Sequence, residues 1–299
     1  MFKKIAVPIR YIYTHPLTKN SKLSALLRFF NWQITSRLSK NSQQIKWIGN
    51  LKLSMHKGMH GATGCIYVGL PEFNDMSFLL HFLDAKSNFI DIGANVGVYS
   101  LLAAGTQKSK TIAIEPIPQT FQYLTTNIQL NQLENLVNCY NIGLSDKKGE
   151  LHFTKDKDTI NHVTAVKSEN TINVKVDTLD NLLSHTSLSS TLIKLDVEGF
   201  EYHVLSGGSN TLNNENVMAL IVELNGSSDK YELSDEMVDK QLVAYGFEKY
   251  DYNPFTRELT ALTQFHHEAN TLYIRNSKLS VIKEKLKAAP SFQILNKTI

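Results

Sequence analysis

The stretch "NFIDIGANVGVYSLLAA", Asn88 to Ala104, combines a short apolar strand, one acid, two glycines and the start of a helix. A strand that runs through a glycine turn into a helix brings backbone N–H groups and the positive helix end to the carboxyl edge of a sheet, where open α/β sheets bind ligands. Gly93 and Gly97 permit a tight turn and a close approach that a Cβ would block. Asp91 is placed to attract a cationic or hydroxyl-bearing ligand. We therefore expect a ligand site at this turn.

Strand-like and helix-like segments alternate from about residue 69 onward. The apolar residues of the expected strands form continuous runs, which is typical of parallel strands covered by helices on both faces. Two segments at 149–153 and 171–176 instead alternate polar and apolar residues and predict an inserted, solvent-facing hairpin. We predict an α/β fold with a doubly wound, mostly parallel seven-stranded sheet of the Rossmann-like kind, whose strands lie at 88–92, 110–115, 136–142, 190–196, 217–225, 247–252 and 270–276.

The spacing of the glycine turn discriminates between nucleoside cofactors. A dinucleotide site prefers glycine at positions one, three and six, but counting from Gly93 places Asn95 at three and Val98 at six. The acid-x-Gly-x-Asn-x-Gly variant suits S-adenosylmethionine, which has an ammonium and a carboxylate but no phosphate. Glu115 ends the second strand, 22 residues after Gly93, and is positioned to accept hydrogen bonds from a ribose diol. Such an acid indicates a nucleoside ligand, but it occurs in sites for dinucleotides and for S-adenosylmethionine and does not distinguish between them.

A second cluster lies in "IKLDVEGFE", Ile193 to Glu201. In an extended chain, Lys194, Asp196 and Glu198 point to one side, and a lysine inside an apolar strand is costly unless it is paired. The cluster is either a buried ion pair that fixes strand and helix, or a catalytic group beside the cofactor methyl. In the second case Lys194 or Glu198 accepts a proton from a substrate hydroxyl, and Asp196 holds the lysine or the cofactor ammonium.

Carboxylates at neighbouring strand ends raise the question of a metal. Asp196, Glu198 and Glu223 could offer oxygen ligands to Mg²⁺, but this ion has no spacing rule that would support the assignment. We therefore expect a reaction without a metal.

Several motifs taken together resemble the FkbM family of S-adenosylmethionine-dependent methyltransferases: "FIDIGANVGVYSLLAA", "IEPIPQTFQYLTTNIQLN", "NIGLSDKKGELHF", "LIKLDVEGFEYHVLSGG" and "ALIVELN". The resemblance covers about residues 67–276 and implies a class I methyltransferase domain. It implies cofactor contacts from Asp91, Gly93, Asn95, Gly97 and Glu115, with Pro116 and Gly143 beside the adenine and Glu72 near the cofactor pocket. It further implies O-methylation, so we expect an acceptor hydroxyl on a glycan, a glycolipid or another small molecule.

Two other functions are open at this point. A membrane-surface binding protein on a decayed methyltransferase core would need a broken cofactor loop, yet Gly93, Gly97 and Glu115 are all present. Methylation of nucleic acid would use the basic N-terminus, but the fourth-strand motif lacks the Asn/Asp-Pro-Pro-aromatic run common in base-amine methyltransferases, and no RNA-binding module is recognisable. Nucleic acid is therefore not favoured.

The N-terminal 71 residues contain eleven Lys and Arg and no Asp or Glu, whereas the rest holds 20 Lys and Arg against 28 Asp and Glu. Six apolar residues in this region share one stripe of an expected helix: Leu23, Leu26, Leu27, Phe30, Ile34 and Leu38. The stripe packs on the main domain or on a second subunit, or it lies on an anionic membrane; nucleic acid is a third partner for the bases. We expect a basic, partly helical extension (1–66), a methyltransferase domain (67–276) and a basic tail (277–299) with a short helix and a frayed end.

Localisation follows from what the sequence lacks. No apolar run approaches the length of about 20 residues that spans a bilayer, and the N-terminus has no signal-peptide pattern. Cys65 and Cys139 have the spacing of neither a disulfide framework nor a zinc site. We expect a cytoplasmic protein, and leave open a peripheral contact with an anionic membrane through residues 1–57.

Overall fold

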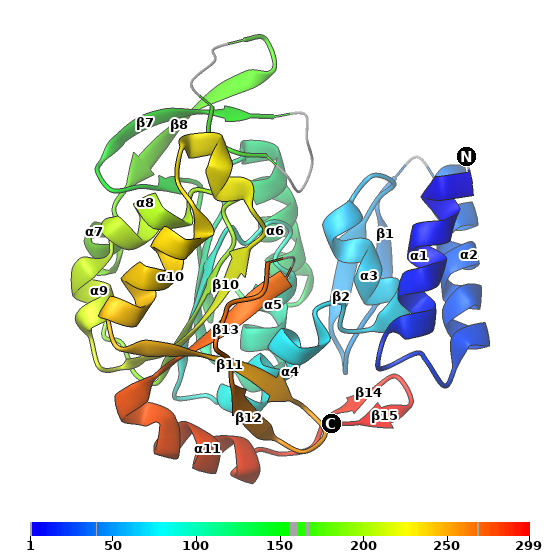
Figure 1. Ribbon diagram of the computed structural model, residues 1–299. Helices are drawn as coiled ribbons and strands as arrows, with labels where there is room; N and C mark the ends of the chain where they lie inside the picture. The colour runs from blue at the N-terminus through cyan, green and yellow to red at the C-terminus, as the bar shows by residue number, and fades with distance from the viewer. Residues whose placement is uncertain (1, 40, 156–160, 165–167, 268) are drawn as a thin grey trace.

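The computed structural model describes residues 2–39, 41–155, 161–164, 168–267 and 269–299, and its centre is an eight-stranded sheet (Figure 1). The strand order is β12-β11-β13-β10-β9-β3-β4-β5. Five strands are parallel: β3 (Asn88–Ile92), β4 (Lys110–Ile114), β5 (Val137–Tyr140), β9 (Thr191–Leu195) and β10 (Val217–Leu224). Three are antiparallel at one edge: β13 (Ala269–Arg275), β11 (Phe247–Asn253) and β12 (Glu258–Ala261).

The predicted doubly wound, mostly parallel sheet is confirmed, with eight strands instead of seven. The additional strand, β12, is an edge strand that pairs only with β11, and three of its four residues are exposed. An exposed edge strand needs no apolar face, so its sequence carries no hydrophobic pattern that would predict it.

Helices cover the two faces of the sheet in separate layers (Figure 1). One layer consists of α7 (Leu179–Leu183), α8 (Glu201–Ser206), α9 (Ser209–Asn213) and α10 (Asp235–Ala244). The other consists of α4 (Phe73–Phe82), α5 (Val98–Leu101), its π-helical continuation η1 (Leu102–Thr106) and α6 (Pro118–Leu130). Ile90 and Ile92 of β3 join the hydrophobic cluster of the first layer, whereas Phe89 joins the cluster of the second. Because strand side chains alternate, Asp91 faces the second layer with Phe89.

The inserted segment forms a separate three-stranded sheet from β6 (Gly143–Leu144), β7 (Gly149–Thr154) and β8 (Thr171–Asp177). The predicted hairpin is confirmed, since β7 and β8 pair in antiparallel register. It faces solvent on one side only. Phe153 and Val176 pack with Ile117 and Phe200 of the main domain, so the insertion covers part of the carboxyl edge of the large sheet.

The N-terminal residues form α1 (Phe2–Thr14), α2 (Lys22–Leu38), the hairpin β1 (Gln43–Lys46) and β2 (Lys52–Met55), and α3 (His60–Val68). The helix predicted from the apolar stripe is therefore present as α2. Its opposite face buries Ala25, Phe29 and Trp32 in the same hydrophobic cluster as α4 and α5. Among the stripe residues, Leu26 packs against this cluster.

The C-terminal residues form η4 (Asn276–Lys278), α11 (Leu279–Ala288) and a small hairpin of β14 (Gln293–Ile294) and β15 (Lys297–Thr298). The predicted short helix is present, but the end that follows it is ordered and not frayed. Arg257 donates hydrogen bonds to the carbonyls of Leu286 (3.1 Å) and Ala289 (2.6 Å), and Ile294 and Ile299 are buried. None of the described helices combines the length and the apolarity needed to cross a bilayer. The domain boundaries at residues 66 and 276 stay predictions.

Candidate active site

A row of polar side chains crosses the face of the sheet that α4 to α6 cover. Asp91 of β3 is in register with Lys194 of β9, and Glu223 of β10 is in register with Asn270 of β13. Each lies two residues along its strand from a member of the hydrophobic cluster that includes α4 and α5 (Phe89, Leu192, Ile221 and Leu272), so all four face the same layer. The parallel strands end here, and a cavity of about 360 Å³ opens at this edge. Ten of the eleven predicted site residues line it: Glu72, Asp91, Gly93, Asn95, Glu115, Pro116, Gly143, Lys194, Asp196 and Glu198.

The exception is Gly97. Both Gly93 (φ +82°) and Gly97 (φ +88°) have left-handed backbones. A Cβ at Gly93 would collide with the carbonyl oxygen of Asp196, and one at Gly97 would lie 2.6 Å from Cδ1 of Leu124 in α6. The surrounding protein therefore requires both glycines, whereas the sequence suggested that a ligand does. Gly97 is not among the residues that line the cavity, and its close contact is with Leu124 of α6, so the cofactor contact expected for it stays a prediction.

Glu115 is held in one orientation by the turn. Its Oε2 accepts the N–H of Asn95 (3.0 Å), and its Oε1 accepts the N–H of Ile117 (2.9 Å). Burial raises the pKa of Glu115 to about 7, against the effect of these two hydrogen bonds. Each carboxylate oxygen retains a further acceptor position, and the residue lines the cavity. This arrangement fits a ribose diol.

Apolar side chains line the cavity beside Pro116 and Gly143. Ile117, Ile142 and Phe153 belong to this part of the wall. Such surroundings fit a planar, weakly polar group such as an adenine ring.

The cavity carries a large excess of acidic groups. Lys194 is the single Lys or Arg among its described lining residues, against six carboxyl groups: Glu72, Asp91, Glu115, Asp196, Glu198 and Glu223. Asp91 is buried and accepts the hydroxyl of Ser100 at 2.6 Å. Burial raises the pKa of Asp91 to about 6. A cavity of this composition favours a cationic ligand, and S-adenosylmethionine carries both a sulfonium and an ammonium.

Lys194 forms a buried ion pair with Asp196, at 2.6 Å between Nζ and Oδ2. Its Nζ also lies 4.9 Å from the ring centroid of Tyr99. Burial disfavours the ammonium, but the charges of Asp196, Glu72 and Asp91 outweigh it and raise the pKa of Lys194 above its ordinary value. A lysine that keeps its proton is a poor general base, so the geometry favours Glu198 among the two bases that the sequence left open.

Glu72 precedes α4 and connects three elements. It accepts the hydroxyl of Tyr99 (2.5 Å) and the amide of Asn270 (2.6 Å), and Asn270 also donates to Asp75 (3.2 Å). Sequence reasoning missed Tyr99, Asp75 and Asn270. The available signal for Tyr99 was its place two residues after Gly97, inside the glycine-turn stretch.

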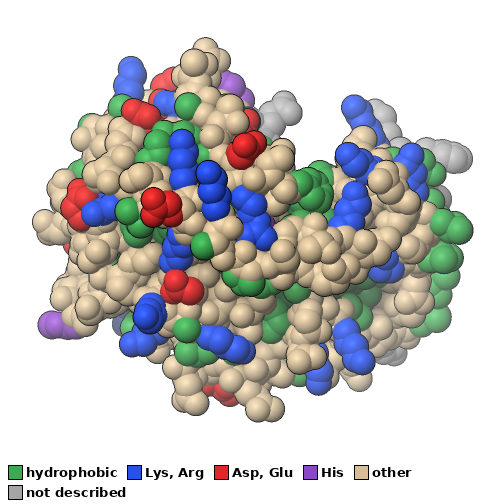
Figure 2. Space-filling model, turned by 90° about the horizontal axis from the view of Figure 1, so that it is seen from below, with side chains coloured by type: hydrophobic (Ala, Val, Ile, Leu, Met, Phe, Trp, Pro, Cys, Tyr) green, Lys and Arg blue, Asp and Glu red, His purple; other side chains and the backbone are tan. Residues whose placement is uncertain are grey.

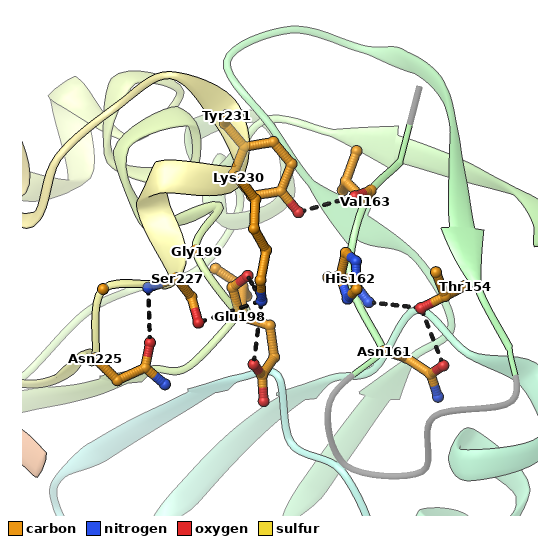
Figure 3. Close-up of polar contacts among 12 residues, drawn as sticks. Thr154, Asn161, His162, Val163, Glu198, Gly199, Asn225, Ser227, Lys230 and Tyr231 are labelled. Atoms are coloured by element: carbon orange, nitrogen blue, oxygen red, sulfur yellow. Dashed lines mark hydrogen bonds and ion pairs between the residues drawn. The ribbon is translucent and has the colours of Figure 1, made fainter. Parts of the chain in front are cut away.

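Glu198 lies in a strained turn at the mouth of the cavity (Figure 3). Its φ is +57°, and the next residue is Gly199, where a Cβ would collide with the carbonyl of Ser227. Glu201 holds the turn by accepting the N–H groups of Val197 (3.0 Å) and Gly199 (3.2 Å). Burial is the main cause, and the negative charge of Asp196 the second, of a pKa of Glu198 that is raised to about 7. Strained backbone and a shifted pKa are both common at functional sites.

Lys230 of η3 (Ser227–Tyr231) lies beside Glu198, with its Nζ 3.9 Å from Oε2 (Figure 3). Glu223 is the third carboxyl group here. Burial, and after it the charge of Asp196, raises the pKa of Glu223 to about 9. Asp196, Glu198 and Glu223 offer oxygens within 4.8 Å of one another, and acidic groups of this kind are common without an ion. The expected metal independence stays a prediction.

The insertion forms the opposite wall of the mouth (Figure 3). Tyr231 of η3 donates a hydrogen bond from its hydroxyl to the carbonyl of Val163 (2.9 Å), which ties the two walls together. Thr154 accepts the N–H of His162 (3.1 Å) and lies 3.2 Å from the amide oxygen of Asn161. Asn161 and Val163 line the cavity.

The fold and the site define a Rossmann-like protein with a nucleoside cavity at its carboxyl edge. The family model of the methyltransferase FkbM domain matches residues 91–253, more than half of the chain, and the chain belongs to this family. This confirms the resemblance read from the motifs. S-adenosylmethionine is accordingly the cofactor of the domain, and the acceptor groups and charge of the cavity fit it.

Known proteins similar to this chain include the hexuronic acid methyltransferase AglP of Haloferax volcanii, 28% identical over 153 residues, which are 51% of this chain and 62% of that protein. A tRNA(Phe) (4-demethylwyosine(37)-C(7)) aminocarboxypropyltransferase of Pyrococcus horikoshii is 43% identical over 61 residues, 20% of this chain and 22% of that protein. The crystal structure of an FkbM methyltransferase from Methylobacillus flagellatus KT is 14% identical, with a TM-score of 0.45 and coverage of 71% of this chain and 52% of that chain. The chain thus matches less than two thirds of the length of each of these three proteins.

Proposed function

We propose that this protein transfers the methyl group of S-adenosylmethionine to a hydroxyl group of a sugar-containing acceptor. One observation carries the proposal. A single cavity contains both Glu115, held by two backbone N–H groups with acceptor positions to spare, and Glu198, a carboxyl group whose pKa is raised to about 7 by burial. The first suits a nucleoside, and the second suits a general base. The cytoplasmic location expected from the sequence is part of the proposal.

The bound cofactor supplies an electrophilic methyl group, and the chain supplies orientation, charge and a dry environment. Glu115 orients the ribose, and the carboxylates of Asp91 and Glu72 offer partners for the ammonium. Phe153 and Phe200 line the cavity and limit the access of water. The acidic excess of the cavity favours the cationic cofactor over its neutral-sulfur product, which assists product release.

Glu198 accepts the proton of the acceptor hydroxyl while the new O–C bond forms and the S–C bond of the methyl donor breaks. A base with a pKa near the working pH is most effective in such a step, and Glu198 meets this condition. Lys194 instead donates a hydrogen bond to Asp196, and Glu223 lies beside the same Asp196. These three residues position the turn in which Glu198 lies.

The acceptor class rests on the similarity to a protein described as a hexuronic acid methyltransferase and on the charge at the mouth. The ammonium of Lys230, partly exposed beside Glu198, offers a partner to an acceptor carboxylate. A uronic acid presents hydroxyl groups next to such a carboxylate. We therefore take a hexuronic acid glycoside as the test acceptor.

The test uses methyl-labelled S-adenosylmethionine with p-nitrophenyl glucuronide, and with p-nitrophenyl glucoside as the neutral match. Calorimetry measures cofactor binding in parallel. Label in the glucuronide at a hydroxyl oxygen supports the proposal. Cofactor binding without label in either sugar overturns the sugar acceptor, and failure to bind the cofactor overturns the methyltransferase.

A further inference from the structure

Helix α2 exposes a continuous stripe of large apolar side chains. The exposed fractions are 73% for Leu23, 61% for Leu27, 48% for Phe30, 59% for Ile34 and 81% for Leu38. Residues at this spacing share one side of a helix. The opposite side is buried in the core through Ala25, Phe29 and Trp32. The helix is therefore held by the rest of the protein with its apolar stripe turned outward.

Basic side chains surround the stripe. Lys22 and Arg37, at the two ends of α2, are exposed, as are Arg10 of α1 and Lys19 of the connecting turn. No acid occurs before Glu72, so these charges have no carboxylate partner in the extension. Figure 2 shows apolar side chains along the outer edge of the extension, on the right of the view, with Lys and Arg side chains beside them.

The combination discriminates between three kinds of partner. A second copy of the chain would bring two basic faces together without acids to pair them, which is unfavourable. Nucleic acid would engage the bases but would leave five large apolar side chains without a function. An anionic bilayer uses both features, because apolar side chains enter the boundary between headgroups and acyl chains while bases attract the headgroups.

We propose that α2 docks the protein peripherally on an anionic membrane surface. The stripe of Leu23, Leu27, Phe30, Ile34 and Leu38 enters the interface, and Lys22 and Arg37 lie at the level of the headgroups. Because α2 is folded and packed before it binds, no ordering of the helix opposes the interaction. The proposal does not depend on the reaction catalysed, so its test requires neither cofactor nor acceptor.

The test is co-sedimentation of the full chain with phosphatidylcholine vesicles that contain either no phosphatidylserine or about 30% of it. We expect binding to the anionic vesicles, weakened by raising the salt from about 0.1 to 0.5 M. The double variant L27Q/I34Q should lose at least about tenfold in partition coefficient. The variant K22Q/R37Q should lose the preference for phosphatidylserine.

The matched control is M237Q/V243Q, which replaces two exposed apolar residues of α10 and should partition like the wild type. Unchanged thermal unfolding shows that the variants are folded. Equal partition of L27Q/I34Q and the wild type overturns the proposal. Two further results would overturn it. One is a wild-type dimer in sedimentation velocity that becomes a monomer in L27Q/I34Q. The other is retention of the wild type by RNA at physiological salt without binding to vesicles.

Discussion

Glu198 combines a left-handed backbone, a neighbouring ammonium and a pKa near neutrality. No one of these features makes it a base. Together they place a carboxyl group with a raised pKa at the mouth of the cavity, as the proposed transfer to a hydroxyl group requires. Lys194 is closer to the centre of the sheet, but its ion pair with Asp196 keeps it protonated.

The substitution Glu198→Gln tests this assignment. We expect kcat to fall by about 100-fold or more, because a general base contributes on that scale, and the dissociation constant of S-adenosylmethionine to change by less than about threefold. Methyl transfer at saturating cofactor and calorimetry provide the two quantities. Asp229→Asn, which removes an exposed carboxylate of η3 outside the cavity lining, is the control. Loss of less than threefold in kcat for E198Q would remove Glu198 from the mechanism.

At the scale of elements, the turn from β3 to α5 brings three segments together. Gly93 lets the end of β3 approach the end of β9 at Asp196, and Gly97 lets α5 start against α6 at Leu124. Both contacts are made between protein groups. The ligand site is consequently a product of tight packing around it, and its shape depends on the helix that covers it.

The substitution Gly97→Ala measures this packing. We expect it to lower the free energy of unfolding by about 2–5 kcal/mol, of which about 1–2 kcal/mol is left-handed strain and the rest is crowding against Leu124. Gly246→Ala is the matched control, since Gly246 has φ +82° and no atom within 4 Å of an added Cβ, so it should lose the strain part alone. Urea unfolding gives both values. Equal losses of unfolding free energy in the two variants would show that Leu124 moves away from the added methyl group without destabilising the fold.

At the scale of the whole molecule, the cavity concentrates negative charge that the cofactor is suited to balance. Burial raises the pKa of Asp91 to about 6, of Glu115 and Glu198 to about 7 and of Glu223 to about 9. A folded-state pKa above the unfolded value means that the stability contributed by the group is complete below about pH 4 and is lost as the pH rises through the folded value. The free protein should therefore lose this contribution between about pH 4 and 9.

A cation bound in the cavity offsets this loss. We expect the rise in Tm caused by S-adenosylmethionine to increase between about pH 5 and 8, and calorimetry near pH 7 to detect protons released on binding. His15 and His81, whose pKa values burial lowers to about 4, stabilise the free fold with the opposite pH dependence. Both histidines lie outside the described cavity lining. Their contribution to stability is therefore the same in the bound and the free protein, and it cancels in the difference between the two Tm values. A Tm difference that shrinks toward pH 8 would contradict the charge argument.

Much of the fold could be predicted because its signals are local. Four of the five parallel strands are largely apolar runs buried on both faces, and β5, at the edge of the sheet, is partly exposed. Strands β12 and β1 escaped prediction because none of their residues is buried. Strand β2 buries Leu53 and Met55, but four residues are too few to carry a clear alternating pattern. Ten of the predicted site residues line one cavity because most of them lie at or shortly after the ends of strands, which a parallel sheet brings to one edge.

Tyr99, Asp75 and Asn270 could not be found in this way, since helix packing and an antiparallel strand bring them to Glu72.

The sequence by itself determined the doubly wound sheet, the cofactor turn and the basic character of the N-terminal extension, because periodicity, glycine and charge are properties of neighbouring residues. Only the tertiary structure decided that Lys194 is paired and Glu198 is available, that Gly97 serves packing, and that the apolar stripe of α2 faces outward. Burial and pKa depend on atoms from distant parts of the chain, and those distances exist only once the chain is folded.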